Sequence, residues 1–177
     1  KLGGTFFKHN VTDEDRWIEI INETEKKYGR IDILVNNAGI VKPGNPENQT
    51  TEEYKLTMSV HMDSTFFGCK YVIPVMAKTG GGSIVNMCSI ASVQGESYVA
   101  AYCAAKGAIE AYSRAVAVHC GLAKNGVRCN TIHPSGIATP MVASVPALME
   151  EKFGPSPVQE LSLIHISEPT RPVTIAY

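Results

Sequence analysis

Two side chains with complementary ionisable groups stand four positions apart in the middle of the sequence. Tyr102 and Lys106 are one helical turn apart, so on a helix their phenol and ammonium lie on the same face. A tyrosine has an ordinary pKa of about 10, and a nearby cation favours its ionised form. Lys106 is therefore expected to lower the pKa of Tyr102, which makes Tyr102 a candidate general acid and base. Ser89, thirteen residues before Tyr102, is a candidate to hydrogen-bond the same reacting oxygen.

A tyrosine–lysine pair of this spacing is a weak signal by itself, because such pairs also occur on solvated helix faces. The elements around it make the pair more specific. An apolar run over residues 83–88 predicts a buried strand that ends just before Ser89. The alanine-rich segment over residues 100–123 predicts the helix that carries Tyr102 and Lys106. The serine and the pair thus belong to consecutive elements.

The rest of the chain repeats this alternation of strands and helices. The pattern predicts strands over 5–9, 31–35 and 127–132, a helix from the capping signal at 12–15 to Gly29, a long helix over 50–78 interrupted near Pro74, and a loop region over 134–154. Such alternation indicates a doubly wound parallel sheet of the Rossmann-like α/β class with helices on both faces.

In such sheets ligands bind beyond the carboxyl ends of the strands, where this chain places small and polar residues. Asn36-Asn37-Ala38-Gly39 follows the strand over 31–35, Ser89 follows the next, and His133-Pro134-Ser135-Gly136 follows the strand over 127–132. Each loop alone could be an ordinary tight turn. Together with the tyrosine–lysine pair they predict a ligand site at this edge of the sheet.

Composition excludes several classes of protein. The chain has 177 residues, a hydrophobic fraction of 44% and a net charge of −1, with no run of like charges. These values argue against a nucleic-acid partner, and the apolar runs are too short for a membrane span. The five cysteines form no C-x-x-C pair and the five histidines are scattered, so we expect no metal site and a reducing, cytoplasmic setting.

The order and spacing of these motifs over residues 3 to about 145 resemble the short-chain dehydrogenase/reductase family. The resemblance rests on Asn-Asn-Ala-Gly after a buried strand, Ser89, the Tyr102–Lys106 pair, and the segment Pro-Ser-Gly-Ile-Ala-Thr-Pro-Met at 134–141. It implies a hydride transfer between NAD or NADP and a secondary alcohol or ketone. By the family pattern Tyr102 transfers the proton, Ser89 positions the substrate oxygen, and Lys106 lowers the tyrosine pKa and holds the nicotinamide ribose.

The resemblance also implies cofactor contacts. Besides Tyr102 and Lys106, the positions that match the family's cofactor-binding residues are Asn10, Val11, Asn37, Ala38, Gly39, Ile137 and Thr139. Asn10 stands where the family more often has Asp, and Ser135 stands where it usually has Gly. His61 stands where the family has an Asn whose main-chain carbonyl holds a water on the catalytic lysine. We therefore include His61 among the catalytic candidates as a tuning, structural or inactivating residue, and expect it to titrate near pH 6 to 7.

Both ends of the sequence look unlike those of a complete gene. The chain starts at Lys1, and by the family pattern about two βα units with the Gly-rich pyrophosphate loop would precede it. Residues 161–177 begin LSLIHISEPTR, which spells a translated sequencing adapter. We therefore interpret 1–160 as a partial Rossmann-like dehydrogenase domain, incomplete at both ends, followed by an adapter-derived tail. Alone, this fragment is expected to be inactive.

The favoured function is thus that of an alcohol dehydrogenase or ketone reductase. A non-catalytic dinucleotide-binding relative and a carbon–oxygen lyase or epimerase remain alternatives, which the retained Ser89, Tyr102 and Lys106 disfavour. Ile90, Gln94, Tyr98 and residues 141–145 predict a mostly apolar substrate wall, which suits an alicyclic or steroid-like substrate. The small residues of the helix over 100–123, together with the helix over 51–78, resemble the family's contact between subunits and predict a homotetramer or homodimer.

Overall fold

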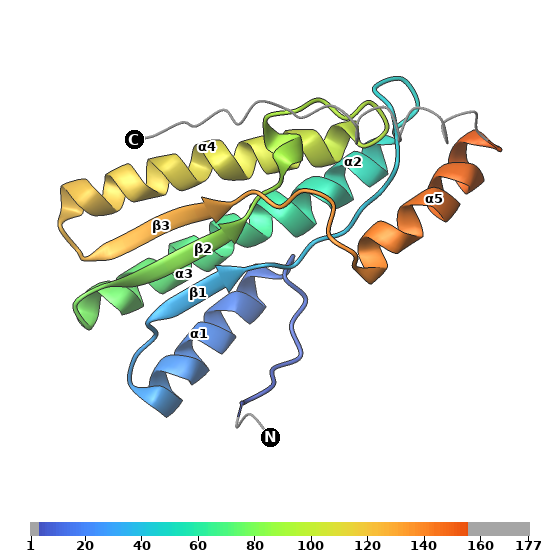
Figure 1. Ribbon diagram of the computed structural model, residues 1–177. Helices are drawn as coiled ribbons and strands as arrows, with labels where there is room; N and C mark the ends of the chain where they lie inside the picture. The colour runs from blue at the N-terminus through green and yellow to red at the C-terminus, as the bar shows by residue number, and fades with distance from the viewer. Residues whose placement is uncertain (1–3, 156–177) are drawn as a thin grey trace.

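The computed structural model describes residues 4–155 as a parallel three-stranded sheet with helices packed along it (Figure 1). The elements in chain order are α1 (Glu14–Tyr28), β1 (Ile33–Asn36), α2 (Thr51–Met58), the π-helical turn η1 (Ser59–Asp63), α3 (Ser64–Lys78), β2 (Gly82–Met87), the 3₁₀ turn η2 (Ile90–Ser92), α4 (Ala100–Ala123), β3 (Val127–Ile132) and α5 (Pro140–Phe153). The Rossmann-like α/β class expected from the sequence is confirmed.

The sheet order is β1-β2-β3, and all three strands run parallel. Asn36 pairs in register with Asn86, and Met87 pairs with Ile132, so the strands end close together at one edge. The residues that follow them, Asn37, Cys88 and His133, therefore emerge side by side. This common edge is where the candidate site forms.

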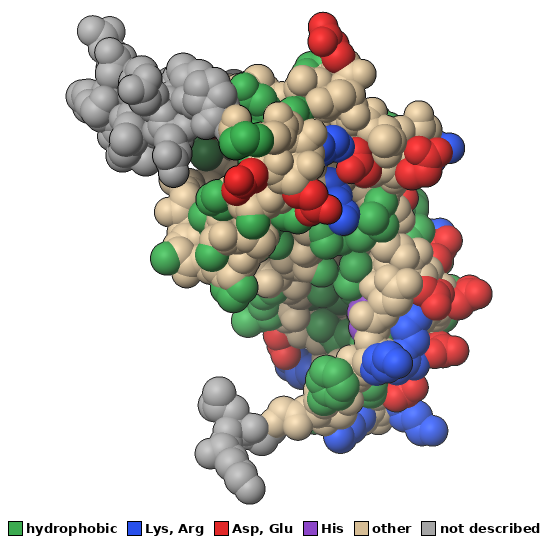
Figure 2. Space-filling model, turned by 90° about the vertical axis from the view of Figure 1, so that its right-hand side faces the viewer, with side chains coloured by type: hydrophobic (Ala, Val, Ile, Leu, Met, Phe, Trp, Pro, Cys, Tyr) green, Lys and Arg blue, Asp and Glu red, His purple; other side chains and the backbone are tan. Residues whose placement is uncertain are grey.

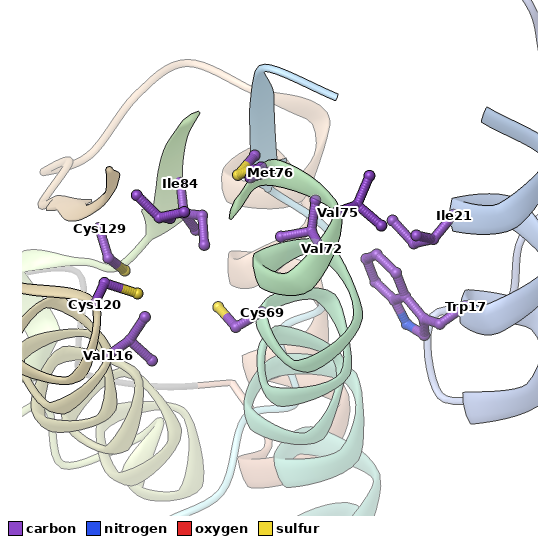
Figure 3. Close-up of a cluster of buried hydrophobic side chains, with 11 residues drawn as sticks. Trp17, Ile21, Cys69, Val72, Val75, Met76, Ile84, Val116, Cys120 and Cys129 are labelled. Atoms are coloured by element: carbon purple, nitrogen blue, oxygen red, sulfur yellow. The ribbon is translucent and has the colours of Figure 1, made fainter. Parts of the chain in front are cut away.

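The core lies between the sheet and the helices α1, α3 and α4. Trp17 and Ile21 of α1 point toward Val72 and Val75 of α3, as Figure 3 shows. Ile84 of β2 and residues of α4 and β3 complete the same buried cluster, which consists of Trp17, Ile21, Cys69, Val72, Val75, Met76, Ile84, Val116, Cys120, Val127 and Cys129. Close packing of this cluster fixes α4 against the strands, and α4 carries Tyr102 and Lys106.

Two helices have the ends that their sequences predict. α1 begins after Asp13, whose side chain accepts a hydrogen bond from the Arg16 backbone N–H at 3.1 Å, and ends at Gly29, whose φ of 77° suits glycine. α4 covers the expected range, residues 100–123, and β3 covers 127–132. The strands predicted over 31–35 and 83–88 form as β1 and β2, each shifted by one or two residues.

The predicted strand over residues 5–9 does not form. These residues are extended but pair with no strand in the described part of the chain. Side chains of α1 hold them instead: the Thr5 hydroxyl lies 2.6 Å from the Tyr28 hydroxyl, and the Arg16 guanidinium donates to the Lys8 carbonyl at 3.0 Å. An extended segment without a neighbouring strand has no ladder partner for its backbone groups.

The long helix predicted over residues 50–78 is interrupted, but not near Pro74. Pro74 lies inside α3, which continues past it to Lys78. The interruption is the π-helical turn η1, which contains His61. Such a turn inserts an extra residue into the helix, and π turns of this kind occur often at functional sites.

The predicted loop region over 134–154 contains a helix, α5. Thr139 caps it by accepting a hydrogen bond from the Val142 backbone N–H at 3.3 Å, and Pro140 occupies the first helical position, where proline is favoured. Pro146 lies within the helix, and no residue of α5 is buried. The expected loop is therefore wrong over residues 140–153, because Pro140 begins this helix and Pro146 is accommodated within it.

Helices cover only one face of the sheet in the part of the chain that the structure describes. Ile33 and Val35 of β1 are 65% and 53% exposed, and Ile132 at the end of β3 is 49% exposed. The alternating exposure shows that these side chains point away from α1, α3 and α4. The expectation that helices cover both faces is therefore not met within residues 4–155. Among these residues no helix is long and apolar enough to cross a membrane.

Candidate active site

Ser89 and Tyr102 meet at the edge where β2 ends. Ser89 adopts an extended conformation and starts the turn η2, with its hydroxyl accepting a hydrogen bond from the Ala91 backbone N–H at 3.2 Å. The same side chain lies close enough to the Tyr102 hydroxyl to lower its pKa. Tyr102 comes from the first turn of α4, so a strand end and a helix start bring the two hydroxyl groups together. Both groups can therefore bind one substrate oxygen.

The pKa of Tyr102 is raised, contrary to the sequence-based expectation. Burial disfavours the phenolate and outweighs the influence of the Ser89 side chain, which lowers the pKa. The ammonium of Lys106 lies over the Tyr102 ring, 5.4 Å from its centroid. In this arrangement the lysine does not offset the effect of burial.

Lys106 is buried behind the tyrosine. Its ammonium donates a hydrogen bond to the Met87 carbonyl at 2.6 Å, and burial lowers the pKa of the lysine to about 8. Only 5% of the residue is exposed, so its charge is held at the end of β2. An ammonium has three protons. The bond to Met87 is the only hydrogen bond recorded for it among the described residues, so two protons remain to bind a ligand.

His61 reaches the same cluster from η1. Its ring lies edge-on to the Tyr102 ring, with centroids 5.2 Å apart, and its Nε2 lies 2.8 Å from the Ile40 carbonyl. The Ile40 backbone N–H also lies 3.2 Å from Nε2, so Ile40 can engage this nitrogen in either tautomer. Nδ1 is buried with no hydrogen-bond partner among the described residues.

Burial, together with the nearby charge of Lys106, lowers the pKa of His61 to about 4. The expected titration near pH 6 to 7 is therefore wrong, because the imidazole is already neutral in that range. His61 fixes the loop after β1 instead. A Cβ on Gly39 would lie 2.7 Å from Cε1 of His61, so this position of the loop needs glycine.

The loop Asn37-Ala38-Gly39 thus stands directly beside the Ser89–Tyr102 pair. Asn37 and Ala38 are exposed, and their backbone is open to a ligand. Gly44, farther along the same loop, donates to the Tyr98 carbonyl at 2.7 Å, which ties the loop to the segment before α4. Of the predicted cofactor residues, the structure therefore brings Asn37, Ala38, Gly39, Tyr102 and Lys106 to one edge.

Three of the four other predicted cofactor residues are engaged in local structure. The Asn10 side chain accepts from the Thr12 backbone N–H at 3.2 Å, and the Val11 carbonyl accepts from the Trp17 indole at 2.9 Å. Ile137 is exposed, and the Thr139 hydroxyl caps α5. Within residues 4–155 no hydrogen bond joins any of these four to Ser89, Tyr102 or Lys106.

A buried amide pair that sequence reasoning missed lies beneath the site. The Asn36 amide donates to the Asn86 side-chain carbonyl at 2.8 Å, and the Asn86 amide donates to the Ser113 hydroxyl at 2.8 Å. Both asparagines are paired in register on neighbouring strands. The signal in the sequence is an asparagine at the matching position of two neighbouring apolar strands, which predicts that the two amides meet. The network ties β1, β2 and α4 together below the site.

A second network that the sequence did not reveal lies behind Ser89. The Ser92 hydroxyl donates to the Glu110 carboxylate at 2.7 Å and lies 3.1 Å from Nδ1 of His133. The same nitrogen lies 3.2 Å from the Ser89 carbonyl. These contacts hold the Ser89 loop against α4 and the end of β3.

Figure 2 views the molecule from the side at which the strands end, and hydrophobic side chains gather in the middle of this face with charged ones along one edge. The face can thus take a partly apolar substrate beside the polar groups of the site.

A family model described as enoyl-(acyl carrier protein) reductase matches residues 1–161. Among curated proteins, the chain is 40% identical over 146 residues to an NADP-dependent (R)-specific alcohol dehydrogenase from Lentilactobacillus kefiri, covering 80% of this chain and 58% of that protein. It is 39% identical over 142 residues to a 3-beta-hydroxysteroid dehydrogenase from Comamonas testosteroni, covering 80% and 56%. A cyclopentanol dehydrogenase from Comamonas sp. is 37% identical over 144 residues, with coverage of 81% and 57%.

The fold has a close match among solved structures. A crystal structure of a short-chain dehydrogenase/reductase from Burkholderia xenovorans superposes with a TM-score of 0.80 and 31% identity, covering 92% of this chain and 60% of that one. The chain spans about half the length of the curated relatives it matches.

Proposed function

Because the chain belongs to the short-chain dehydrogenase/reductase family, we propose that its Ser89, Tyr102 and Lys106 catalyse oxidation of a secondary alcohol and reduction of the ketone. The observation that carries the proposal is the Ser89 side chain beside the Tyr102 hydroxyl, with the Lys106 ammonium buried against the Tyr102 ring. Two hydroxyl groups and a cation at one strand end suit a reaction in which a substrate oxygen gains or loses a proton.

The residues at this edge fit a nicotinamide cofactor, NAD or NADP. Two protons of the Lys106 ammonium are available to ribose hydroxyls, and the exposed backbone of Asn37 and Ala38 lies in the adjacent loop. The His61 ring contacts both Gly39 and Tyr102 and so links this loop to the tyrosine. When bound, the cofactor supplies or accepts the hydride.

In the direction of ketone reduction, Tyr102 gives its proton to the substrate oxygen while Ser89 holds that oxygen by a hydrogen bond. The raised pKa of Tyr102 suits the protonated form that donates. A cation beside the phenolate that remains stabilises it, and the Lys106 ammonium lies within 5.4 Å of the ring centroid. In alcohol oxidation the same groups act in reverse.

We propose a neutral alicyclic or steroid-like alcohol as substrate. Tyr98 packs edge-on against Phe153 of α5 with ring centroids 5.3 Å apart, which places aromatic surface next to the segment that holds Ser89. The similar proteins named as acting on a hydroxysteroid and on cyclopentanol support the same class. Turnover of phosphorylated or CoA-linked substrates only, in a panel that includes cyclic alcohols, would contradict this assignment.

The test of the chemistry is Tyr102→Phe in a full-length protein that carries these residues. The substitution keeps the ring and removes the ionisable oxygen, so kcat is expected to fall by roughly 10²- to 10⁴-fold. Cofactor affinity, measured by fluorescence titration, is expected to stay nearly unchanged. Tyr112→Phe is a matched control on the same helix, away from Ser89. Turnover near the wild-type rate in Tyr102→Phe would refute the proposed chemistry.

We also propose that the protein assembles through the outer faces of α3 and α4. Phe66 of α3 contacts Tyr112 of α4, and Phe66, Val118 and Leu122 are exposed, with Leu122 at 81%. Contiguous apolar side chains on two neighbouring helices favour a subunit contact. Light scattering at micromolar concentration is expected to give a dimer or tetramer that Leu122→Lys weakens, and a monomer in the wild type would contradict the proposal.

A further inference from the structure

Cys88, Glu110 and His133 bring a sulfur, a carboxylate oxygen and an imidazole nitrogen to within 4.8 Å of one another. The three residues come from three different elements: the end of β2, the second turn of α4 after Tyr102, and the end of β3. None of them belongs to the set that transfers the proton. The cluster lies directly behind the turn over residues 89–92, which begins at Ser89.

The sheet register explains why two of these residues meet. Met87 and Ile132 are paired, so Cys88 and His133 leave neighbouring strands at the same level, and the Cys88 backbone N–H donates to the Ile132 carbonyl at 2.8 Å. α4 brings the third residue, because the Cys88 thiol contacts the Lys106 carbonyl at 3.1 Å, one turn before Glu110. The convergence is thus fixed by backbone structure.

Neighbouring groups already orient each side chain toward a shared point. Thr131 holds Nε2 of His133 at 2.9 Å, which leaves Nδ1 facing the cluster. Arg114 holds one oxygen of Glu110 at 2.6 Å, and the other oxygen faces inward. The Ser92 hydroxyl touches both inward atoms, so they point to the same place. Outer contacts of this kind orient the ligands of metal sites.

We propose that Cys88, Glu110 and His133 form a binding site for a zinc-like divalent cation. Thiolate, imidazole and carboxylate are the ligands that Zn²⁺ takes, and three protein ligands leave a fourth position for water or another donor. His133 is exposed, so an ion can enter from solvent. The thiolate and the carboxylate together balance the two positive charges of the ion.

Binding rearranges protons in a defined way. The Cys88 thiol loses its proton to solvent, and its bond to the Lys106 carbonyl is exchanged for a bond to the metal. Nδ1 of His133 gives up its contact with the Ser89 carbonyl and binds through its lone pair. The ring proton is then carried by Nε2, which donates to the Thr131 hydroxyl. Ser92 gives up its bond to the inward oxygen of Glu110. The bound ion would join the ends of β2 and β3 to α4 and so fix the loop that carries Ser89.

The experiment is a titration of the purified full chain with Co²⁺ in place of Zn²⁺, followed by Zn²⁺ competition against a chromogenic chelator. One equivalent of Co²⁺ is expected to give the intense visible bands of a tetrahedral site and a thiolate charge-transfer band. Cys88→Ser, Glu110→Gln and His133→Asn are each expected to weaken binding by at least about 100-fold, the upper end of the effect of losing an outer-shell partner.

Two variants serve as matched controls. Cys103→Ser removes a half-buried thiol and His119→Asn removes an exposed imidazole, both on α4 but outside the cluster. Both are expected to bind Co²⁺ like the wild type. Zn²⁺ is also expected to raise Tm of the wild type but not of Cys88→Ser, because an ion that binds only the folded state stabilises it.

Three outcomes would overturn the proposal. They are the absence of any saturable Co²⁺ band, a band that persists in Cys88→Ser, or a band lost equally in Cys103→Ser. Far-UV circular dichroism of each variant without metal separates loss of the site from loss of the fold. If Cys88→Ser does not fold, Glu110→Gln and His133→Asn test the site independently. Since no turnover is measured, failure here leaves the proposed dehydrogenase chemistry untouched.

Discussion

His61 illustrates how burial changes what a titratable residue can do. An exposed histidine would change charge near neutral pH, whereas this imidazole is only 2% exposed and stays neutral down to about pH 4. Its Nε2 contacts the Ile40 carbonyl, and the edge of its ring lies against Gly39. His61 therefore acts mainly by fixing the position of the loop after β1, and its ring also contacts Tyr102.

The depressed pKa of His61 makes stability depend on pH. The unfolded chain protonates this residue near pH 6.5 and the folded chain only near pH 4. Between these values the unfolded state binds more protons, so acid favours unfolding; the stability present above pH 6.5 falls by up to about 3 kcal/mol as pH drops to about 4. Urea unfolding between pH 7 and pH 4 measures this loss.

Two variants isolate the contribution of His61 from that of the carboxylates, which also titrate in this range. In His61→Asn the fall in stability between pH 6.5 and pH 4 is expected to be smaller by the same amount. In His119→Asn, which removes an exposed imidazole, the fall is expected to match the wild type. An unchanged pH profile in His61→Asn would show that the imidazole is protonated in the folded chain.

At the scale of single residues the sequence was most informative where chemistry depends on spacing. Tyr102 and Lys106 lie on one face of α4 as the four-residue spacing predicts, and Ser89 stands at the strand end beside them. The expected direction of the Tyr102 pKa shift was wrong, because the shift depends mainly on burial, which spacing does not encode. The pairing of Glu110 with Ser92 and His133 depends on tertiary contacts and was likewise invisible.

At the scale of elements, the helices with strong end signals were predicted closely. α2 begins with a full capping box: the Thr50 hydroxyl accepts from the Glu53 backbone N–H at 3.1 Å, and the Glu53 carboxylate accepts from the Thr50 backbone N–H at 3.0 Å. The break in the following helix was misplaced, because proline is a visible signal while a π turn has none in the sequence. The strand over 5–9 failed because a strand needs a partner as well as a pattern.

The capping box gives a direct test at this scale. Thr50→Ala removes the side-chain acceptor from the first turn of α2, and the free energy of unfolding is expected to fall by about 1 kcal/mol. Thr51→Ala, one residue later, removes a similar exposed hydroxyl for which the structure records no hydrogen bond, and is expected to change little. Chemical denaturation measures both. An equal loss in the two variants would show that the cap does not contribute.

At the scale of the whole molecule, the arrangement of layers leaves one face of the sheet without helices in the described chain. Ile33, Val35 and Ile132 lie exposed on that face, with Val85 of β2 between the two outer strands. The apolar run over 31–35 is typical of a strand buried on both faces. Sequence reasoning therefore identified the strand correctly but not its surroundings, since a run of apolar residues does not say what covers them.

This exposed face is expected to bind a hydrophobic dye in the native state. The chain at neutral pH should enhance the fluorescence of anilinonaphthalene sulfonate, because the dye binds contiguous apolar surface. Val35→Lys places a charge in the middle of the patch and is expected to reduce the signal strongly. Val118→Lys, on the outer face of α4, is the comparison and should reduce it less. Equal reductions would place the dye elsewhere.

The loose attachment of α5 has a consequence for hydrogen exchange. α5 buries no residue, and the recorded contacts that attach it to the rest of the chain are the ion pair between Lys152 and Glu53 and the packing of Phe153 on Tyr98. The helix can therefore open without disturbing the core, and its amide protons exchange with deuterium by local opening rather than by global unfolding. Because salt screens a partly exposed ion pair, added salt speeds this exchange in residues 140–153 and leaves that of β2 and α4 almost unchanged.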